Sequence, residues 1–172
     1  MRIIVNDANI LIDLVELGLL QQFFSLPFEF QTTGSIFDEL YEHQQMEFEL
    51  FIRQERLTIV EFTENELTSI NALNLKKPAL SIQDCSAFFQ AHRTEGILIT
   101  GDNTLKKFAK TNHVEAYGHL WVLDRLFEAG ILSGPEASVF LTNLTDRINP
   151  RLGLPDTECQ KRHAAWVFNG SL

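Results

Sequence analysis

Short apolar runs alternate with longer segments of helical periodicity along the first two thirds of the chain. The runs predict buried or half-buried β-strands, and the segments between them predict amphipathic helices. A regular alternation of strand and helix indicates an α/β fold with a parallel sheet. The predicted strands are residues 2–5, 28–31, 57–62, 97–100 and 114–117, and the predicted helices are residues 9–20, 36–54, 63–75, 81–94 and 103–111.

The pattern changes after residue 118, where only helical periodicity remains. Three further helices are predicted, at residues 119–129, 135–147 and 157–168. No internal repeat or change of composition marks a second domain. We therefore expect an α/β core over residues 1–118 and a helical extension, residues 119–172, packed on the same domain.

Composition and charge narrow the range of functions. The 172 residues suit one domain, and 45% hydrophobic residues suffice for a buried core. The net charge of −9 disfavours nonspecific attraction to nucleic acid, so a nucleic-acid ligand would need local basic groups or a bridging cation. The chain contains no apolar run of about 18 residues and opens directly on a strand pattern, so neither a membrane helix nor a signal peptide is expected. Cys85 and Cys159 form no metal or redox motif, which favours thiols in a reducing, cytoplasmic compartment.

Four acidic residues occupy related positions in the predicted fold. Asp7 and Asp102 each follow a buried strand, whereas Glu39 and Asp84 each fall in the first turn of a predicted helix. Parallel topology places all four at the carboxyl edge of the sheet, where α/β proteins bind ligands. Carboxylates brought this close repel each other unless cations neutralise them. Oxygen ligands of this kind suit Mg²⁺ or Mn²⁺.

Each acid also has a purely structural interpretation. Asp84 has capping-box spacing from Ser81, and Asp102 is placed to cap the helix that follows it. Asp38 adjoins Glu39, so either residue can be the second acid of the cluster. The joint pattern, rather than any single acid, indicates a functional site. Asn9 and Thr100 add short polar groups that can orient a carboxylate, a water molecule or a phosphate.

These residues together resemble the PIN-domain family. The resemblance rests on Val5-Asn6-Asp7-Ala8-Asn9, Ser35-Ile36-Phe37-Asp38-Glu39-Leu40, Asp84-Cys85-Ser86-Ala87 and Ile97-Leu98-Ile99-Thr100-Gly101-Asp102, in the family's order and approximate spacing. It covers about residues 2–118, and no single motif in it is specific. The helical tail also resembles one bacterial PIN subgroup. The resemblance implies an α/β/α sandwich with a central parallel sheet of four to five strands.

The same resemblance implies a metal-dependent ribonuclease. Asp7, Glu39, Asp84 and Asp102 would hold Mg²⁺ or Mn²⁺ and be catalytic, with Asn9 and Thr100 in support. Lys106 and Lys107 would contact the RNA backbone, although an ordinary solvated helix face is the commoner explanation of such lysines. Many bacterial PIN proteins are VapC-like toxins, so a cognate antitoxin and a homodimer are expected partners, with no membrane.

Two other classes of function are weighed against this one. A noncatalytic PIN-like module would bind RNA or protein and would not need four clustered carboxylates. A haloacid-type phosphatase would carry Asp-x-Asp after the first strand, whereas this chain has Asp7-Ala8-Asn9. A receiver domain would need paired acids there and a lysine after a later strand, and neither is evident.

Overall fold

A computed structural model describes residues 1–169 of the chain, and residues 170–172, the end of the predicted extension, lie outside the described part. The described chain falls into two compact units. The sheet unit comprises Met1–Ile12 and Pro27–Tyr117, and the helical unit comprises Asp13–Leu26 and the described residues from Gly118 on. The helical unit thus includes a segment near the N-terminus as well as the tail, and the expected division at residue 118 stays a prediction.

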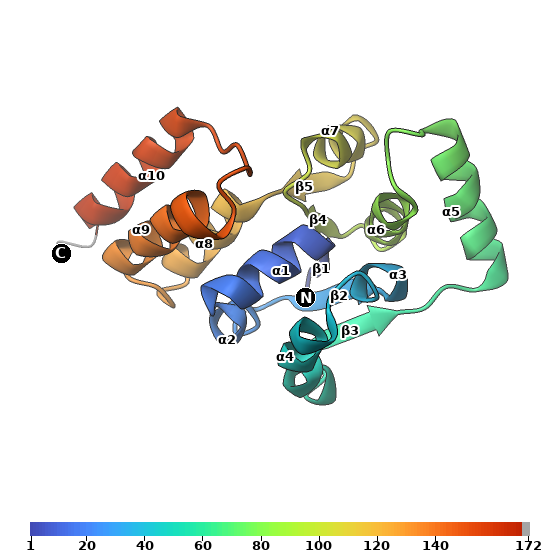
Figure 1. The fold of residues 1–172 in the computed structure, drawn as a ribbon, viewed down its shortest axis with the longest axis horizontal. Helices are drawn as coiled ribbons and strands as arrows, with labels where there is room; N and C mark the ends of the chain where they lie inside the picture. The colour runs from blue at the N-terminus through green and yellow to red at the C-terminus, as the bar shows by residue number, and fades with distance from the viewer. Residues whose placement is uncertain (170–172) are drawn as a thin grey trace. The chain divides into compact units, whose positions relative to one another are not determined.

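The sheet unit is built on five parallel strands in the order β3-β2-β1-β4-β5 (Figure 1). The predicted α/β fold with a parallel sheet of four to five strands is therefore confirmed. The central strand, β1, is apolar and enclosed by neighbours on both sides, as expected for a parallel sheet. The strands are β1 (Ile3–Asn6), β2 (Glu29–Thr33), β3 (Leu57–Val60), β4 (Ile97–Ile99) and β5 (Glu115–Tyr117).

One face of this sheet carries the main core of the unit. Val5, Leu98 and Ala116 are register partners on that face and are fully buried. They belong to one cluster with apolar side chains of the helices between the strands, such as Cys85 and Leu105. The helices of this unit include α3 (Gly34–Phe37), α4 (Glu42–Arg53), α5 (Glu64–Lys76), α6 (Ile82–Arg93) and α7 (Asn103–Thr111). α4 packs beside β3, and α6 packs on β1, β2 and β4.

The predicted long helix over residues 36–54 is wrong. The structure has two helices, α3 and α4, separated by a turn over residues 38–41. Local hydrogen bonds explain the break, because Tyr41 takes an extended conformation and its N–H donates to Gln44 Oε1 at 3.0 Å. The side chain of Gln45 also donates to the carbonyl of Phe37, which closes the turn. Glu39 therefore lies in this turn and not in the first turn of a helix.

The helical unit contains α2 (Leu20–Phe23), α8 (His119–Glu128), α9 (Gly134–Asn143) and α10 (Asp156–Asn169). α1 (Ala8–Leu17) ends at Gly18, which has a φ of +69°, so the predicted helix over residues 9–20 is interrupted. α9 is continued by a π-helix, η1 (Leu144–Ile148), and not by a regular helix to residue 147. A Cβ atom on Gly134 would lie 1.9 Å from the Trp166 carbonyl oxygen, so glycine permits the close contact of α9 with α10.

Polar groups are also buried within the helical unit. His119 Nε2 lies 2.7 Å from Asp13 Oδ2, and Asn149 donates to the same oxygen. These contacts join the segment around Asp13 to the start of α8 and the end of η1. Over residues 1–169, no helix combines the length and the apolar character needed to span a membrane.

Candidate metal-binding site at the carboxyl edge of the sheet

Asp7 occupies the centre of the carboxyl edge, directly after β1. Its backbone N–H donates to the Ile99 carbonyl at 3.0 Å, so it continues the pairing of β1 with β4. Its side chain is only 4% exposed. A buried carboxylate needs several hydrogen-bond donors, because it has lost the water that would otherwise solvate its charge.

Three donors meet the Asp7 carboxylate. The N–H of Ala8 donates to Oδ1 at 2.8 Å, while Asn9 Nδ2 and Thr100 Oγ1 donate to Oδ2 at 2.7 and 2.6 Å. Asn9 also accepts a hydrogen bond from the Gly101 N–H through Oδ1 at 2.7 Å. The loop after β4 is therefore tied to the loop after β1, and the orientation of Asp7 is fixed from both.

The charge on Asp7 is nevertheless disfavoured. The pKa of Asp7 is raised from 3.8 to about 6, mainly by burial and in addition by the charges of Asp84 and Glu39. The hydrogen bonds from Thr100 and Ala8 act in the opposite direction but do not cancel burial. Asp7 is therefore a buried acid in the field of two other acids.

Glu39 and Asp84 are also coupled to each other. Burial first, and then the charge of Asp84, raise the pKa of Glu39, although Glu39 lies at the surface. Between the two adjacent acids, Asp38 and Glu39, it is Glu39 whose charge acts on Asp7. The structure thus brings together Asp7, Glu39 and Asp84, which are far apart in the sequence.

Asp84 and Asp102 both act as helix caps. The Ser81 N–H donates to Asp84 Oδ2 at 2.7 Å while the Asp84 N–H donates to Ser81 Oγ, which is the predicted capping box. The Leu105 N–H donates to Asp102 Oδ1 at 2.7 Å. Each carboxylate keeps its second oxygen outside these capping bonds. Both acids therefore cap helices as expected, and each still has one oxygen that is free of the capping bonds.

Asp102 joins the site through Thr100. The Asp102 N–H donates to Thr100 Oγ1 at 3.0 Å, and the same hydroxyl donates to Asp7. The side chain of Asp102 itself is exposed, and it faces Lys106 one helical turn later. Burial and the charge of Lys110 lower the pKa of Lys106, and the charge of Asp102 raises it. Lys107 is exposed on α7.

The donor chemistry at this edge fits a hard divalent cation, since all four acids offer carboxylate oxygens. As the side chains are placed, however, no three carboxyl, imidazole or thiol groups within residues 1–169 converge on one point where a metal could bind. The capping bonds of Asp84 and Asp102 explain this arrangement, because they direct both carboxylates toward helix N-termini.

The structure also contains a cluster of hydroxyl groups on the segments that carry Asp84 and Glu39, and the sequence alone did not reveal it. Ser86, in the second turn of α6, contacts Thr33 at the end of β2 and Ser35 in α3. Thr33 is also the N-cap of α3, because its side chain accepts a hydrogen bond from the Ile36 N–H. The available signal was the position of Thr33 at the carboxyl end of a strand, since Asp7 and Thr100 directly follow theirs.

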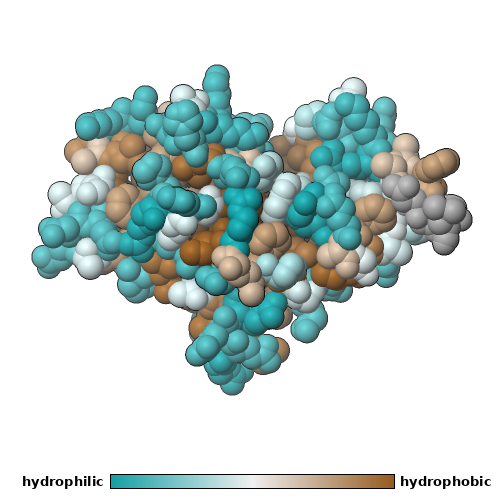
Figure 2. Space-filling view, turned by 180° about the vertical axis from the view of Figure 1, so that it is seen from behind, coloured by the Kyte–Doolittle hydropathy of each residue, from teal (hydrophilic) through white to brown (hydrophobic). Residues whose placement is uncertain are grey.

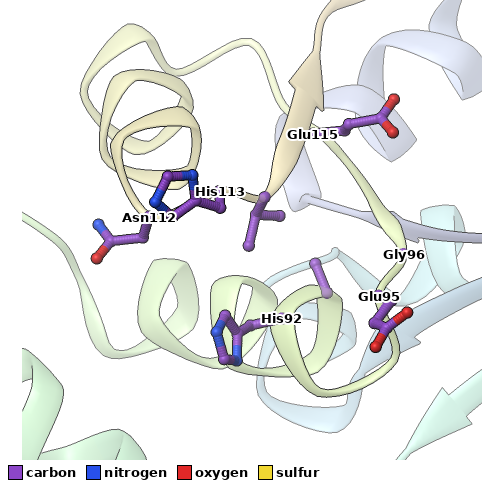
Figure 3. Close-up of a pocket in the computed structure, with 8 residues that line it drawn as sticks. His92, Glu95, Gly96, Asn112, His113 and Glu115 are labelled. Carbon is purple, nitrogen blue, oxygen red and sulfur yellow. The ribbon is translucent and has the colours of Figure 1, made fainter.

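The opposite, amino edge of the sheet carries a shallow pocket of different character. It is lined by the ends of α6 and α7 and the starts of β4 and β5, including His92, Glu95, His113 and Glu115. Figure 3 shows the two imidazole rings and the two carboxylates spread around this pocket without converging. Arg2 forms a salt bridge with Glu115 at 2.6 Å, so one of these acids is already neutralised. The pocket offers no ligand set comparable to the carboxyl edge.

The fold and the site define an α/β protein with an acidic site at the carboxyl edge of a five-stranded parallel sheet. A family model described as PIN domain matches residues 3–155, and the chain belongs to the PIN-domain family. The match extends beyond the sheet unit and includes α8 and α9. A search of curated proteins found no match to the chain. PIN domains are generally nucleases and usually use divalent metals.

Proposed function

We propose that this protein is a divalent-metal-dependent ribonuclease that hydrolyses internal phosphodiester bonds of RNA. The observation that carries the proposal is the state of Asp7, which is buried, coupled to Asp84 and Glu39, and shifted to a pKa of about 6. A fold gains no stability from such a carboxylate unless a cation compensates its charge. Membership of the PIN-domain family supplies the reaction class.

In this proposal Asp7, Glu39, Asp84 and Asp102 hold the cation and are the catalytic acids. A bound Mg²⁺ or Mn²⁺ would supply Lewis acidity to the scissile phosphate and lower the pKa of the attacking water. Thr100 and Asn9 keep Asp7 in one orientation, since both donate to its Oδ2. Asp102 is held beside them by the bond from its N–H to Thr100.

Lysines near the acids support contact with an RNA backbone, and we assign substrate binding to Lys106 and Lys107. Within residues 1–169, five lysines of the sheet unit form no salt bridge with a carboxylate, whereas Arg2 and Arg93 each do. Positive charge that is not neutralised by a salt bridge, in a chain of net charge −9, favours a role with a phosphate backbone. The five lysines are Lys76, Lys77, Lys106, Lys107 and Lys110.

The biological setting follows as part of the same proposal. A ribonuclease of this kind would act as a cytoplasmic toxin restrained by an antitoxin, and it would form a homodimer. Both cysteines are free thiols, which supports a reducing compartment. On the face drawn in Figure 2, hydrophobic residues reach the surface between hydrophilic ones. Such residues are common on the surfaces of monomers and oligomers alike.

A noncatalytic RNA- or protein-binding module is the second candidate. One observation favours it, namely that the four acids do not converge and that Asp84 and Asp102 cap helices. This candidate and the ribonuclease differ in whether a cation binds at the acids.

The experiment that separates them is cleavage of single-stranded RNA with Mn²⁺ or Mg²⁺ by the wild type, Asp7→Asn, Asp102→Asn and Glu95→Gln. Glu95 is the matched control, because it is an exposed acid of the same unit at the amino edge. The ribonuclease predicts activity in the wild type and Glu95→Gln and a loss of at least about 100-fold in both aspartate variants. Equal activity in all four would indicate a contaminating nuclease. No cleavage and no rise in Tm with metal would favour the binding module.

A further inference from the structure

Three hydroxyl groups from distant parts of the sequence meet in the sheet unit. Ser86 Oγ lies 2.8 Å from Thr33 Oγ1 and 3.1 Å from Ser35 Oγ, and the latter two are 3.2 Å apart. Thr33 is fully buried and Ser86 is 2% exposed, whereas Ser35 reaches the surface. We call Thr33, Ser35 and Ser86 the hydroxyl cluster. It joins the β2–α3 junction to α6.

The hydrogen-bond pattern of the cluster has one consistent direction. Ser86 donates its only hydroxyl proton to the Gln83 carbonyl at 2.7 Å, so toward Thr33 and Ser35 it is an acceptor. Thr33 accepts from the Ile36 N–H and donates to Ser86. Every proton of the buried pair therefore has a partner. A satisfied buried network of this kind fixes the relative position of the segments it joins.

The two joined segments carry two of the acids. Ser86 is two residues after Asp84 in α6, and Ser35 is four residues before Glu39, which follows α3. Asp84 and Glu39 interact electrostatically with each other and with Asp7. Since Asp84 and Glu39 are on separate elements, their separation depends on how α3 is held against α6. The hydroxyl cluster provides a direct hydrogen-bonded link between these two elements.

Packing alone does not require a hydroxyl at position 86. Alanine would fill nearly the same space there, because it differs from serine only by the missing hydroxyl oxygen. A serine at this position costs desolvation, which its bonds to Thr33, Ser35 and Gln83 compensate. The hydroxyl of Ser86 therefore adds directional hydrogen bonds, and its role is not only to fill space.

We propose that Ser86, through Thr33 and Ser35, is a positioning residue that sets the spacing of Glu39 and Asp84 for cation binding. This inference rests on the proposed metal-dependent function, because the acids need a defined spacing only if they share a ligand. Ser86 touches neither substrate nor cation in this role. Residues that orient metal ligands in this way typically change metal affinity by about 10- to 100-fold when removed.

The test compares Ser86→Ala with Thr94→Val by titrating the purified full chain with Mn²⁺ and recording Tm. Thr94 follows the opposite end of α6, and its hydroxyl donates to the Gln90 carbonyl at 2.7 Å. We expect Ser86→Ala to raise the Mn²⁺ concentration for half-maximal stabilisation by about 10-fold. Thr94→Val should leave that concentration unchanged, even if both variants have a lower Tm without metal.

A double-mutant cycle distinguishes positioning from a general loss of stability. In an Asp84→Asn background, Ser86→Ala should have no further effect on the Mn²⁺ midpoint, because the acid that it positions is absent. Ser35→Ala provides a variant that is more easily tolerated, since Ser35 is exposed, and it should shift the midpoint in the same direction by a smaller factor.

The outcomes separate this inference from the proposed function. If the wild type shows neither Mn²⁺-dependent stabilisation nor cleavage, the proposed function fails and the positioning role falls with it. If the wild type binds Mn²⁺ and Ser86→Ala has the same midpoint as Thr94→Val, only the positioning role is overturned. An undiminished effect of Ser86→Ala in the Asp84→Asn background would also overturn it.

Discussion

The two edges of the same parallel sheet use charged residues in opposite ways. At the carboxyl edge, Asp7 is buried, held by three hydrogen-bond donors and surrounded by other acids. At the amino edge, Glu95 and His113 are exposed and take a left-handed backbone conformation with φ values of 50° and 61°. At the carboxyl edge the unfavourable energy is electrostatic and comes from side chains. At the amino edge it is conformational strain of the backbone. Burying acids next to one another is the arrangement for which the proposed cation would compensate, whereas a positive φ at an exposed residue is an ordinary feature of a turn.

The largest expected effect concerns the pH dependence of folding stability without metal. Asp7 has a pKa of about 6 in the folded state against 3.8 as its ordinary value. The folded state therefore holds the Asp7 proton more tightly than the unfolded chain does. Stability is full below pH 4 and is lost as the pH rises through 6, by on the order of 3 kcal/mol from this residue.

Asp7→Asn removes this titration. We expect the difference in free energy of unfolding, variant minus wild type, to rise between pH 4 and pH 7 by on the order of 3 kcal/mol, measured by urea unfolding in EDTA. Comparing the difference rather than the wild type alone is necessary, because Glu115 and Glu136 have lowered pKa values and act in the opposite sense. Glu95→Gln should change stability by less than about 0.5 kcal/mol at each pH. If the difference for Asp7→Asn does not change with pH, the pKa of Asp7 is not raised in the folded state.

Much of this site was predictable because parallel topology converts sequence order into proximity. Asp7 and Thr100 follow apolar runs of β1 and β4, and parallel strands bring their carboxyl ends to one edge. The capping box of Ser81 and Asp84 was also visible, because it needs only residues three apart. Local signals and topology were sufficient for these features.

Other features depend on contacts that no local pattern encodes. The bond between Ser86 and Thr33 joins residues 53 positions apart. Glu95, two residues after the end of α6, takes the left-handed conformation, although the next residue, Gly96, would adopt it more easily. A Cβ atom on Gly96 would lie 3.0 Å from the Ile3 carbonyl oxygen, so this glycine allows the backbone of β4 to approach β1. The role of a glycine is decided by its neighbour in space, which the sequence does not display.

The second prediction tests the hydrogen bonds that orient Asp7. Thr100→Val keeps the shape of a fully buried side chain but removes the donor to Asp7 and the acceptor of the Asp102 N–H. We expect an affinity for Mn²⁺ about 10- to 100-fold weaker, by calorimetry, with a parallel loss of cleavage. Thr94→Val makes the same chemical change near the amino edge and should alter neither quantity. Equal effects of the two variants would mean that the edges do not differ in function.

The smallest expected effect lies at the amino edge. His113 follows the end of α7, and its φ of 61° is unfavourable for any residue with a Cβ atom. Glycine relieves this strain but adds freedom to the unfolded chain, so His113→Gly should raise the free energy of unfolding by about 0.5 to 1 kcal/mol. The gain is measured by urea unfolding and should be independent of Mn²⁺.

The same variant also probes the pocket of Figure 3, because His113 is part of its lining. Removing the imidazole should leave RNA cleavage and the Mn²⁺ midpoint unchanged if function resides at the carboxyl edge. A stabilised variant with altered cleavage would instead show that the pocket contributes to substrate binding. A destabilised variant with unchanged cleavage would show that His113 makes contacts worth more than the backbone strain. Each result therefore assigns the amino edge to stability or to function, which no substitution among the acids can do.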